Sequence, residues 1–585
     1  MGCQMASAQI SRFQNRESGG VDTLCNMTTD ADIAREYTAR PITDISGPLG
    51  VHEEDLLPYG REIAKVHQRA LERPRNASLN PEPKLVLVSA ITPTPAGEGK
   101  TTTSIGLAQA MHHLGENVCL ALREPSLGPC MGIKGGACGG GHSQVMPMDR
   151  INLHFTGDLH AVTAANNVLA ALLDNHLHFG NELEIDPRRV VWRRVMDMND
   201  RTLRDIVVGL GGTGNGIPRE DGFDITVASE VMAALCLADG LEDLRLRLER
   251  LIVGFTRENK PVTAGDLGAV GAMLVLLRDA LQPNLVQTLE GAPAFIHGGP
   301  FANIAHGCNS VTATKMAMHH ANWAITEAGF GADLGAEKFF HIKCRQTGLD
   351  PAAVVLVATV RALKMHGGVS KDDLTTPNPE AVRLGLANLD KHIENIQGFG
   401  KPPVVAINRF ADDADEELAV IRAHCELKGV SVAESRHFGE GGKGAVELAK
   451  AVMTAVETPA PAWTPLYALE DDPHAKIRTL AKKVYGAKDV AFTAAAERDL
   501  KRISNLGFDN LPICVAKVPG SLSDDPTLPG RPEGFTVTVR NVTVNAGAGF
   551  LVVLTGAIMR MPGLPRLPRA AGMDLDADGE ILGLD

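Results

Sequence analysis

A short segment of the sequence carries the residue types that a phosphate-binding loop needs. It reads Thr94-Pro95-Ala96-Gly97-Glu98-Gly99-Lys100-Thr101, and Thr102 follows. Glycines let the backbone approach phosphate oxygens, a lysine adds positive charge, and a threonine hydroxyl can ligate magnesium. We therefore predict that residues 94–102 bind a nucleotide, with Lys100 in catalysis and Thr101 on the metal. The alternative is an ordinary glycine turn capped by threonines, and Thr94 stands where a Walker A loop has its first glycine.

A second glycine-rich stretch begins with Arg123 and Glu124 and extends to Gln144. Six glycines fall between residues 132 and 141, so the backbone amides can face a ligand. The guanidinium fork of Arg123 matches a carboxylate or an acyl phosphate, and Lys134 adds a second positive charge. We predict that Arg123 is a second catalytic residue. A salt bridge between Arg123 and a nearby acid is the alternative.

Both loops follow apolar runs that we expect to be β-strands. The sequence predicts strands at 84–91, 117–122, 354–358 and 404–408, and a helix at 101–113. Apolar, often β-branched runs that alternate with helical segments indicate an α/β fold. We expect a P-loop-type, mostly parallel sheet flanked by helices, with two smaller α/β domains.

Composition excludes several other classes of protein. The chain has 585 residues, a formal net charge of -13 and ten cysteines, none in a CxxC pair. An acidic protein is a poor candidate for binding nucleic acid through a basic surface. No apolar run reaches the roughly 18 residues that span a bilayer. We therefore expect a reduced, cytoplasmic protein without a nucleic-acid or membrane partner.

Long stretches of the chain resemble one family, formate–tetrahydrofolate ligase in its monofunctional form. The matching segments are 92–103, 123–144, 152–158, 163–167, 174–176, 211–215, 224–230, 297–310, 326–338, 358–368 and 561–565. The resemblance implies ATP-dependent ligation of formate to tetrahydrofolate through formyl phosphate. It also implies ATP with magnesium, an activating monovalent cation such as potassium or ammonium, and a homotetramer.

The resemblance also assigns substrate and metal residues. Phe410 and Phe438 would sandwich the pterin of the folate, although most relatives have Trp in place of Phe438. Core packing is the alternative for each ring. Glu124 and Asp158 are candidate ligands for magnesium or the monovalent cation.

We expect four parts in the chain. Residues 1–26 are a flexible extension, with Met27 as an alternative start, and 27–330 form the domain for the nucleotide and formyl phosphate. Residues 331–460 form a second α/β domain that contributes to the folate site, and 461–585 a smaller C-terminal domain.

Three further departures from the family pattern affect details, at His142, His341 and 518–520. Two rival functions stay open. One is a generic P-loop ATPase or another carboxylate ligase, and the other is a nucleotide- or folate-binding protein without turnover.

Overall fold

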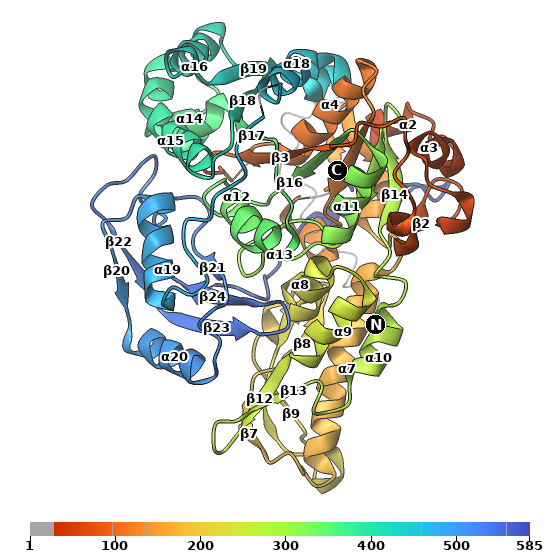
Figure 1. The fold of residues 1–585 in the computed structure, drawn as a ribbon, viewed down its shortest axis with the longest axis vertical. Coiled ribbons are helices and arrows are strands. Elements are labelled where there is room, and N and C mark those ends of the chain that lie inside the picture. The colour runs from red at the N-terminus through yellow and green to blue at the C-terminus, as the bar shows by residue number, and fades with distance from the viewer. Residues whose placement is uncertain (1–28, 96, 135–136, 458, 557, 585) are drawn as a thin grey trace, which may run out of the picture.

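A mostly parallel β-sheet runs through the centre of the protein, which we describe from a computed structural model (Figure 1). The structure describes residues 29–584, apart from 96, 135–136, 458 and 557. In spatial order the main path of the sheet consists of β1 (Leu56–Pro58), β2 (Ala64–Val66), β14 (Asn284–Thr288), β15 (Pro293–Ile296), β4 (Val118–Leu122), β16 (Trp323–Glu327), β3 (Lys84–Ala90), β17 (Ala353–Ala358), β18 (Pro403–Asn408) and β19 (Ser431–Ser435). A short hairpin of β5 (Gly139–Gly140) and β6 (Ser143–Met146) joins it at β14.

The strands from β15 to β19 are parallel, and those at the other edge are antiparallel. Carboxyl ends of parallel strands meet at one edge, so the loops after β3, β4, β16, β17 and β18 gather there. The four strands predicted from sequence are all present, within one or two residues of the expected bounds.

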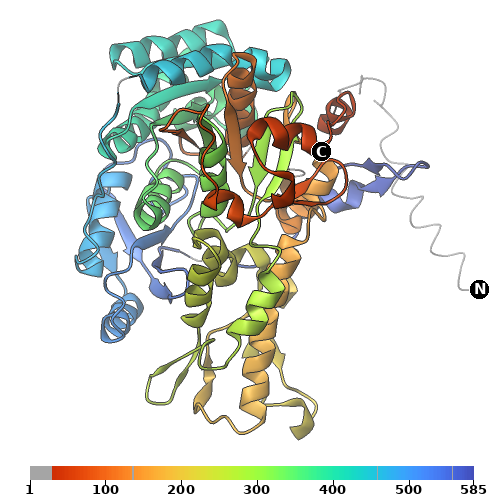
Figure 2. The ribbon, with the colours of Figure 1, turned by 45° about the vertical axis from the view of Figure 1, so that its right-hand side comes forward.

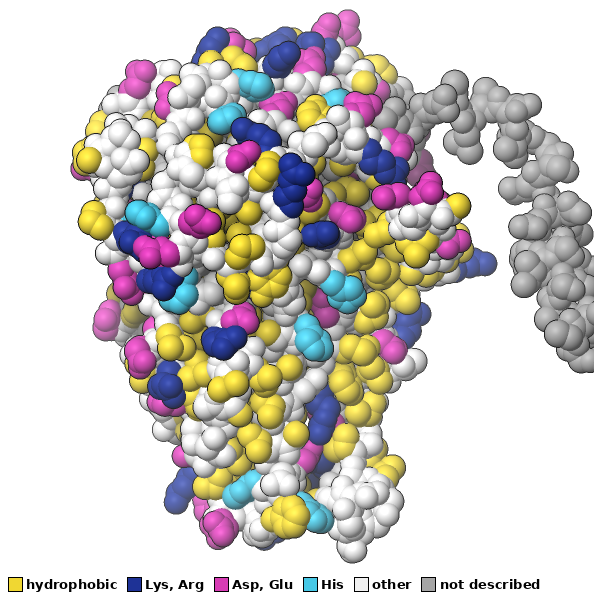
Figure 3. Space-filling model, turned by 90° about the vertical axis from the view of Figure 1, so that its right-hand side faces the viewer, with side chains coloured by type: hydrophobic (Ala, Val, Ile, Leu, Met, Phe, Trp, Pro, Cys, Tyr) yellow, Lys and Arg dark blue, Asp and Glu magenta, His cyan; other side chains and the backbone are white. Residues whose placement is uncertain are grey.

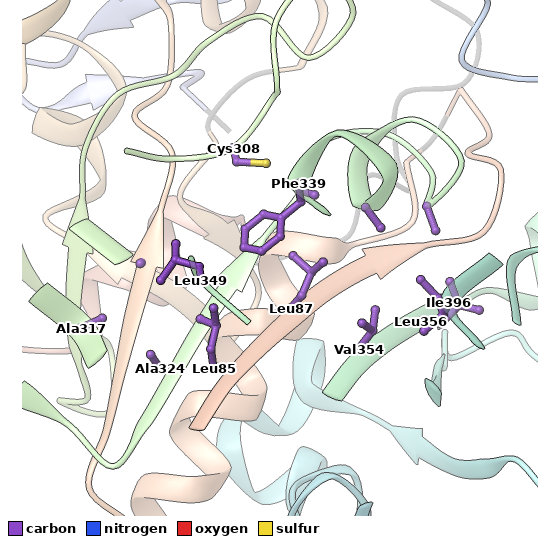
Figure 4. Close-up of a cluster of buried hydrophobic side chains, with 14 of the residues drawn as sticks. Leu85, Leu87, Cys308, Ala317, Ala324, Phe339, Leu349, Val354, Leu356 and Ile396 are labelled. Carbon is purple, nitrogen blue, oxygen red and sulfur yellow. The ribbon is translucent and has the colours of Figure 1, made fainter. Parts of the chain in front are cut away.

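Each face of the sheet is covered by its own helices, because alternate residues of a strand point to opposite faces. Leu85 and Leu87 of β3 belong to one hydrophobic cluster, which Figure 4 shows, and Val86 and Val88 belong to another. The first cluster includes residues of α11 (Val311–His320), η7 (Phe339–Cys344), α14 (Val360–His366), α15 (Pro379–Gly398) and α16 (Asp415–Leu427). The second includes residues of α4 (Lys100–His113) and α18 (Val446–Ala455). The expected arrangement of a sheet flanked by helices is thus confirmed.

A separate lobe extends from the carboxyl edge of the sheet, at the lower right of Figure 1. Its hydrophobic cluster also includes residues of the C-terminal part, such as Cys514 and Phe550. Its main elements are α7 (Asp158–His178), β7 (Ile185–Val190), β8 (Arg194–Met196), β9 (Ile206–Val208), β10 (Arg219–Asp221), β11 (Phe223–Ile225), α8 (Glu230–Leu237), α9 (Leu241–Glu249), β12 (Ile252–Thr256), β13 (Pro261–Thr263) and α10 (Val270–Leu277).

The chain after about residue 460 builds small sheets of its own, drawn in blue in Figures 1 and 2. The sheets formed by residues 489–554 pack around a further hydrophobic cluster. The elements are α19 (Pro473–Leu480), η10 (Ala481–Tyr485), β20 (Asp489–Phe492), α20 (Ala494–Asn505), β21 (Ile513–Ala516), β22 (Thr536–Val539), β23 (Asn541–Asn545), β24 (Phe550–Leu554), β25 (Asp574–Leu575) and β26 (Ile581–Leu582).

The remaining helices are short. They are α2 (Asp30–Arg35), α3 (Ile42–Leu49), α5 (Leu127–Pro129), α6 (Met148–Asn152), α12 (Gly335–Lys338), α13 (Arg345–Thr347) and α17 (His437–Glu440), with a π-helical turn η3 (Cys130–Lys134). No helix in the described part of the chain combines the length and the apolar character that crossing a membrane requires.

The expected domain boundary at residue 330 stays a prediction, and the central sheet has strands on both sides of it. β3 pairs with β17, so strands from both sides of that boundary belong to one sheet. Sequence patterns locate strands but not their partners, and the lobe of residues 158–281 is inserted between strands of the same sheet. The predicted extension of residues 1–26 lies outside the described residues.

Candidate active site

The predicted phosphate loop lies between the carboxyl end of β3 and the start of α4. Gly97 and Gly99 have φ angles of 82° and 74°, a left-handed conformation that glycine adopts without a steric penalty. Lys100 is the first residue of α4, where the amides at a helix N-terminus favour an anion. Ala96 lies outside the described residues. Loop and helix thus have the geometry of an anion cradle.

Glu98 fixes the shape of this loop from inside the protein. Its side chain is buried and accepts hydrogen bonds from the backbone N–H of Thr94 (2.8 Å) and from the hydroxyl of Thr359 (2.5 Å). The side-chain amide of Asn408 donates to the Glu98 carbonyl at 3.1 Å. Thr359 directly follows β17 and Asn408 ends β18. Residues at the ends of neighbouring strands therefore hold the loop in place. Among the residues predicted to bind the nucleotide, Glu98 therefore has a positioning role.

Glu327 connects the phosphate loop to Arg123. It is the last residue of β16, which lies between β3 and β4 in the sheet, and its side chain is 4% exposed. Its Oε2 accepts a hydrogen bond from the Thr101 hydroxyl at 2.8 Å, and its Oε1 lies 3.4 Å from the Arg123 guanidinium. The structure therefore brings Lys100, Thr101 and Arg123 to one place.

Arg123 keeps hydrogen-bonding capacity beyond this ion pair. Its Nε is buried and without a hydrogen-bond partner in the described structure, and its side chain is 28% exposed. A Cβ atom added to Gly329 would lie 3.0 Å from its Nη1, so the guanidinium lies close to the backbone there. The alternative of a salt bridge is thus correct for Arg123 in this state. Its open Nε and partial exposure still suit an anionic ligand.

Glu124 and Asp158 lie near each other, but the Asp158 carboxylate is already paired with other side chains of the protein. The Asp158 carboxylate contacts the Lys65 ammonium at 2.7 Å and the Asn284 amide at 2.8 Å, and both Lys65 and Asp158 are buried. Burial, with the nearby Asp158 charge, raises the pKa of Glu124 well above its usual value. Within the described residues, no group of three or more Asp, Glu, His or Cys side chains is arranged around a metal position. Their predicted role as cation ligands stays a prediction.

Phe410 lies two residues beyond β18, close to the loop that Asn408 braces. The Arg361 guanidinium stacks on its ring at 4.3 Å and is itself held by Asp412 through two contacts of 2.8 and 2.9 Å. One face of the ring is therefore covered by a cation, and the ring's other face is the candidate surface for a pterin.

Phe438 follows the neighbouring strand β19 and lies against the glycine-rich hairpin. Its carbonyl accepts a hydrogen bond from the His142 backbone N–H at 2.8 Å, and its side chain is half exposed. A Cβ atom added to Gly141 would lie 2.1 Å from that carbonyl. Only glycine therefore allows this contact.

His437 is the first residue of α17, the short helix that also contains Phe438. Its ring nitrogens lie 2.8 Å from the Ser435 hydroxyl and 3.5 Å from the Thr103 hydroxyl of α4. Burial lowers the pKa of His437 to about 4, so the ring is neutral at physiological pH. Phe410 and Phe438 follow the adjacent strands β18 and β19 at the carboxyl edge of the sheet. The sandwich of a folate between them stays a prediction.

The departures from the family pattern have local explanations. His142 contacts the Tyr37 hydroxyl through Nδ1 at 3.1 Å. His341 is a buried core residue that stacks on Tyr467 at 5.1 Å, with Glu337 3.2 Å away. Gly520 lies near the Pro93 carbonyl, at the start of the phosphate loop. None of these contacts disturbs the loop itself.

Sequence reasoning missed two residues of this edge. Glu327 was part of a matching segment, but its role depends on β16 lying between β3 and β4. Phe330 has a φ of 61°, an uncommon conformation for a bulky side chain, which is frequent at functional sites. No sequence signal marks that strain.

Fold and site together define an α/β protein with a glycine-rich loop, a lysine and an arginine at the carboxyl edge of a parallel sheet. The family described as formate–tetrahydrofolate ligase matches residues 28–585. A protein of that description from Methylobacterium sp. (strain 4-46) is 57% identical over 564 residues, covering 95% of this chain and 100% of the relative. The chain therefore belongs to the formate–tetrahydrofolate ligase family, whose members are ligase enzymes.

Proposed function

We propose that the protein uses ATP to join formate to tetrahydrofolate and does so through a formyl phosphate intermediate. The observation that carries this proposal is the link from Thr101 through Glu327 to Arg123, since it joins a phosphate cradle to an arginine suited to a carboxylate. ADP, phosphate and 10-formyltetrahydrofolate are the products.

The reaction needs an activated carboxylate, because formate is a poor electrophile. An oxygen of formate attacks the γ-phosphorus, and the bond from that phosphorus to the bridging oxygen of ADP breaks. Lys100 and the amides of the loop neutralise the phosphate charge, and Arg123 clamps formate and then formyl phosphate. The amine of tetrahydrofolate then attacks the formyl carbon, the bond from that carbon to the phosphate oxygen breaks, and the amine proton leaves to water or to the departing phosphate.

Magnesium fits the oxygens present at the loop. When bound, this ion neutralises charge on the phosphates and orients them. The Thr101 hydroxyl and the Glu327 carboxylate already lie together there. Glu124 and Asp158, the ligands that the family resemblance implies, remain part of the proposal. A monovalent cation near Glu124 remains part of the proposal, because Glu124 Oε2 is buried without a hydrogen-bond partner in the described structure.

The folate is proposed to bind at Phe410 and Phe438, beyond the ends of β18 and β19. Flat aromatic faces stack on a pterin, and Phe offers less contact area than Trp. The half-exposed ring of Phe438 supports a role in binding, since core packing would bury it.

We also propose a homotetramer in the cytoplasm. The α10 helix exposes an apolar face of Gly271, Ala272, Val275 and Leu276, and Val275 is 76% exposed. Figure 3 faces the side on which α7 and α10 lie in Figure 1, and hydrophobic side chains gather over its lower half. Apolar surface of this kind is typical of protein contacts.

A mixing experiment separates this function from its rivals. The protein with magnesium-ATP is given formate, tetrahydrofolate, both or neither, and phosphate release is followed. Sustained release only with both substrates supports the ligase. Phosphate release that does not depend on formate or tetrahydrofolate indicates a generic ATPase. No phosphate release in any mixture indicates a binding protein.

A further inference from the structure

We propose that Glu327 couples the binding of magnesium-ATP to the binding of formate. In the unloaded protein the Glu327 carboxylate restrains Arg123, and with magnesium-ATP bound it would face the metal and release Arg123. This inference rests on the proposed function and assigns to Glu327 a positioning role within the same site.

The position of Glu327 gives it access to both ligands. The phosphate loop follows β3, Arg123 follows β4, and β16 lies between these two strands. Glu327 ends β16, in register with Val88 of β3. Its carboxylate therefore lies between the nucleotide cradle and the formate clamp.

Each oxygen of the carboxylate faces one side of the site. Oε2 is bonded to Thr101 at 2.8 Å, and Oε1 faces Arg123 at 3.4 Å. At 4% exposure, little water can replace either partner. The two contacts thus depend on the same buried charge.

A divalent cation at Thr101 changes this balance. A threonine hydroxyl of the loop and an acid from a neighbouring strand are the protein ligands that magnesium uses beside nucleotide phosphates. If Glu327 and Thr101 held the ion, the negative charge of the carboxylate would be neutralised and its attraction for Arg123 would fall. The guanidinium is then available to an anion.

The Glu327 carboxylate is the restraint that we infer for Arg123 in the unloaded protein. Arg123 makes a single long contact with Glu327, and its Nε has no hydrogen-bond partner in the described structure. A small rotation is therefore enough to redirect it to formate. Because coupling of two binding equilibria is reciprocal, formate also strengthens nucleotide binding.

The test measures formate affinity directly, without turnover. The dissociation constant of ¹³C-formate is determined by NMR titration, with and without magnesium and a non-hydrolysable ATP analogue. For the unmodified protein we expect the loaded state to bind formate about five- to twentyfold more tightly. In Glu327→Gln, formate should bind the unloaded protein within about twofold of that tighter value, and the nucleotide should add little.

Two further variants separate coupling from a general structural effect. Glu434→Gln changes another strand carboxylate that pairs with arginine, 3.2 Å from Arg409, and should keep the full coupling. Thr101→Val should reduce the coupling, whereas Thr101→Ser, which keeps the hydroxyl, should retain it.

Three results would overturn the proposal. Equal formate affinity in the two states of the unmodified protein would exclude coupling, while phosphate release that needs both substrates would leave the proposed function standing. Weaker formate binding to unloaded Glu327→Gln would mean that Glu327 orients Arg123 for formate and does not restrain it. No formate binding in either state, with no phosphate release, would reject coupling and function together.

Discussion

At the scale of single residues, the proposed mechanism depends most on Lys100. It is the first residue of α4, directly after the glycines of the loop. We expect Lys100→Ala to reduce turnover by at least about 10²–10³-fold, the usual effect of removing a preorganised charge. Folate binding should persist, because the aromatic residues follow other strands. Steady-state kinetics and folate titration check both, with Lys450→Ala, an exposed helical lysine, as control.

Lys100→Ala with unchanged turnover would reject the phosphate role. The sequence could indicate Lys100 and Arg123 as candidates, because each type of side chain has a chemical reason to occupy its loop. It could not identify Glu327, because that residue acquires its partners only when β16 inserts between β3 and β4.

The size of the ring at residue 438 is a second prediction at this scale. Phe438→Trp should tighten tetrahydrofolate binding and Phe438→Ala should weaken it about three- to tenfold, since stacking contributes about 0.5–1.5 kcal/mol. Fluorescence or calorimetric titration measures the affinity. Phe179→Ala removes another exposed ring, which lies on a different lobe and is 75% exposed against 50% for Phe438, and serves as control. Equal affinity of all variants would place the folate elsewhere.

At the scale of elements, Glu230 ties α8 to the loop before β24. Its carboxylate accepts from the backbone N–H groups of Gly547 (2.8 Å) and Ala548 (3.2 Å), and burial raises its pKa to about 7. The folded pKa exceeds the unfolded value, so this group contributes stability below about pH 4.5 that is lost as pH rises through 7.

The upward shift of the Glu230 pKa sets the expected dependence of stability on pH. Compared with Glu230→Gln, the unmodified protein should lose about 2–3 kcal/mol of unfolding free energy between pH 4.5 and 8. Chemical or thermal unfolding at several pH values measures the difference between the two proteins. A difference that stays constant over this range would show that Glu230 does not titrate in the folded state.

The elements around the site differed in how well sequence could predict them. β3, β4, β17 and β18 were located because fully buried parallel strands are continuous apolar runs. The antiparallel edge with β14 and β15, and the inserted lobe, were not predicted. Local patterns contain no information about which distant strands pair.

At the scale of the whole molecule, the apolar face of α10 is expected to bury itself in the oligomer. Val275→Asp should reduce the assembly below a tetramer, because an interface charge without a partner is costly. Light scattering after size-exclusion chromatography gives the mass. Leu427→Asp, which alters an 85% exposed leucine on α16, should leave it unchanged. An unaltered mass for the α10 variant would place the interface on another face.

The path of one formate oxygen tests the central claim most directly. If formate attacks ATP and the amine then expels phosphate, one oxygen of ¹⁸O-formate must leave in the phosphate product. We predict one ¹⁸O atom per phosphate released in the presence of tetrahydrofolate, as measured by mass spectrometry. Phosphate without ¹⁸O, formed together with 10-formyltetrahydrofolate, would contradict the formyl phosphate route.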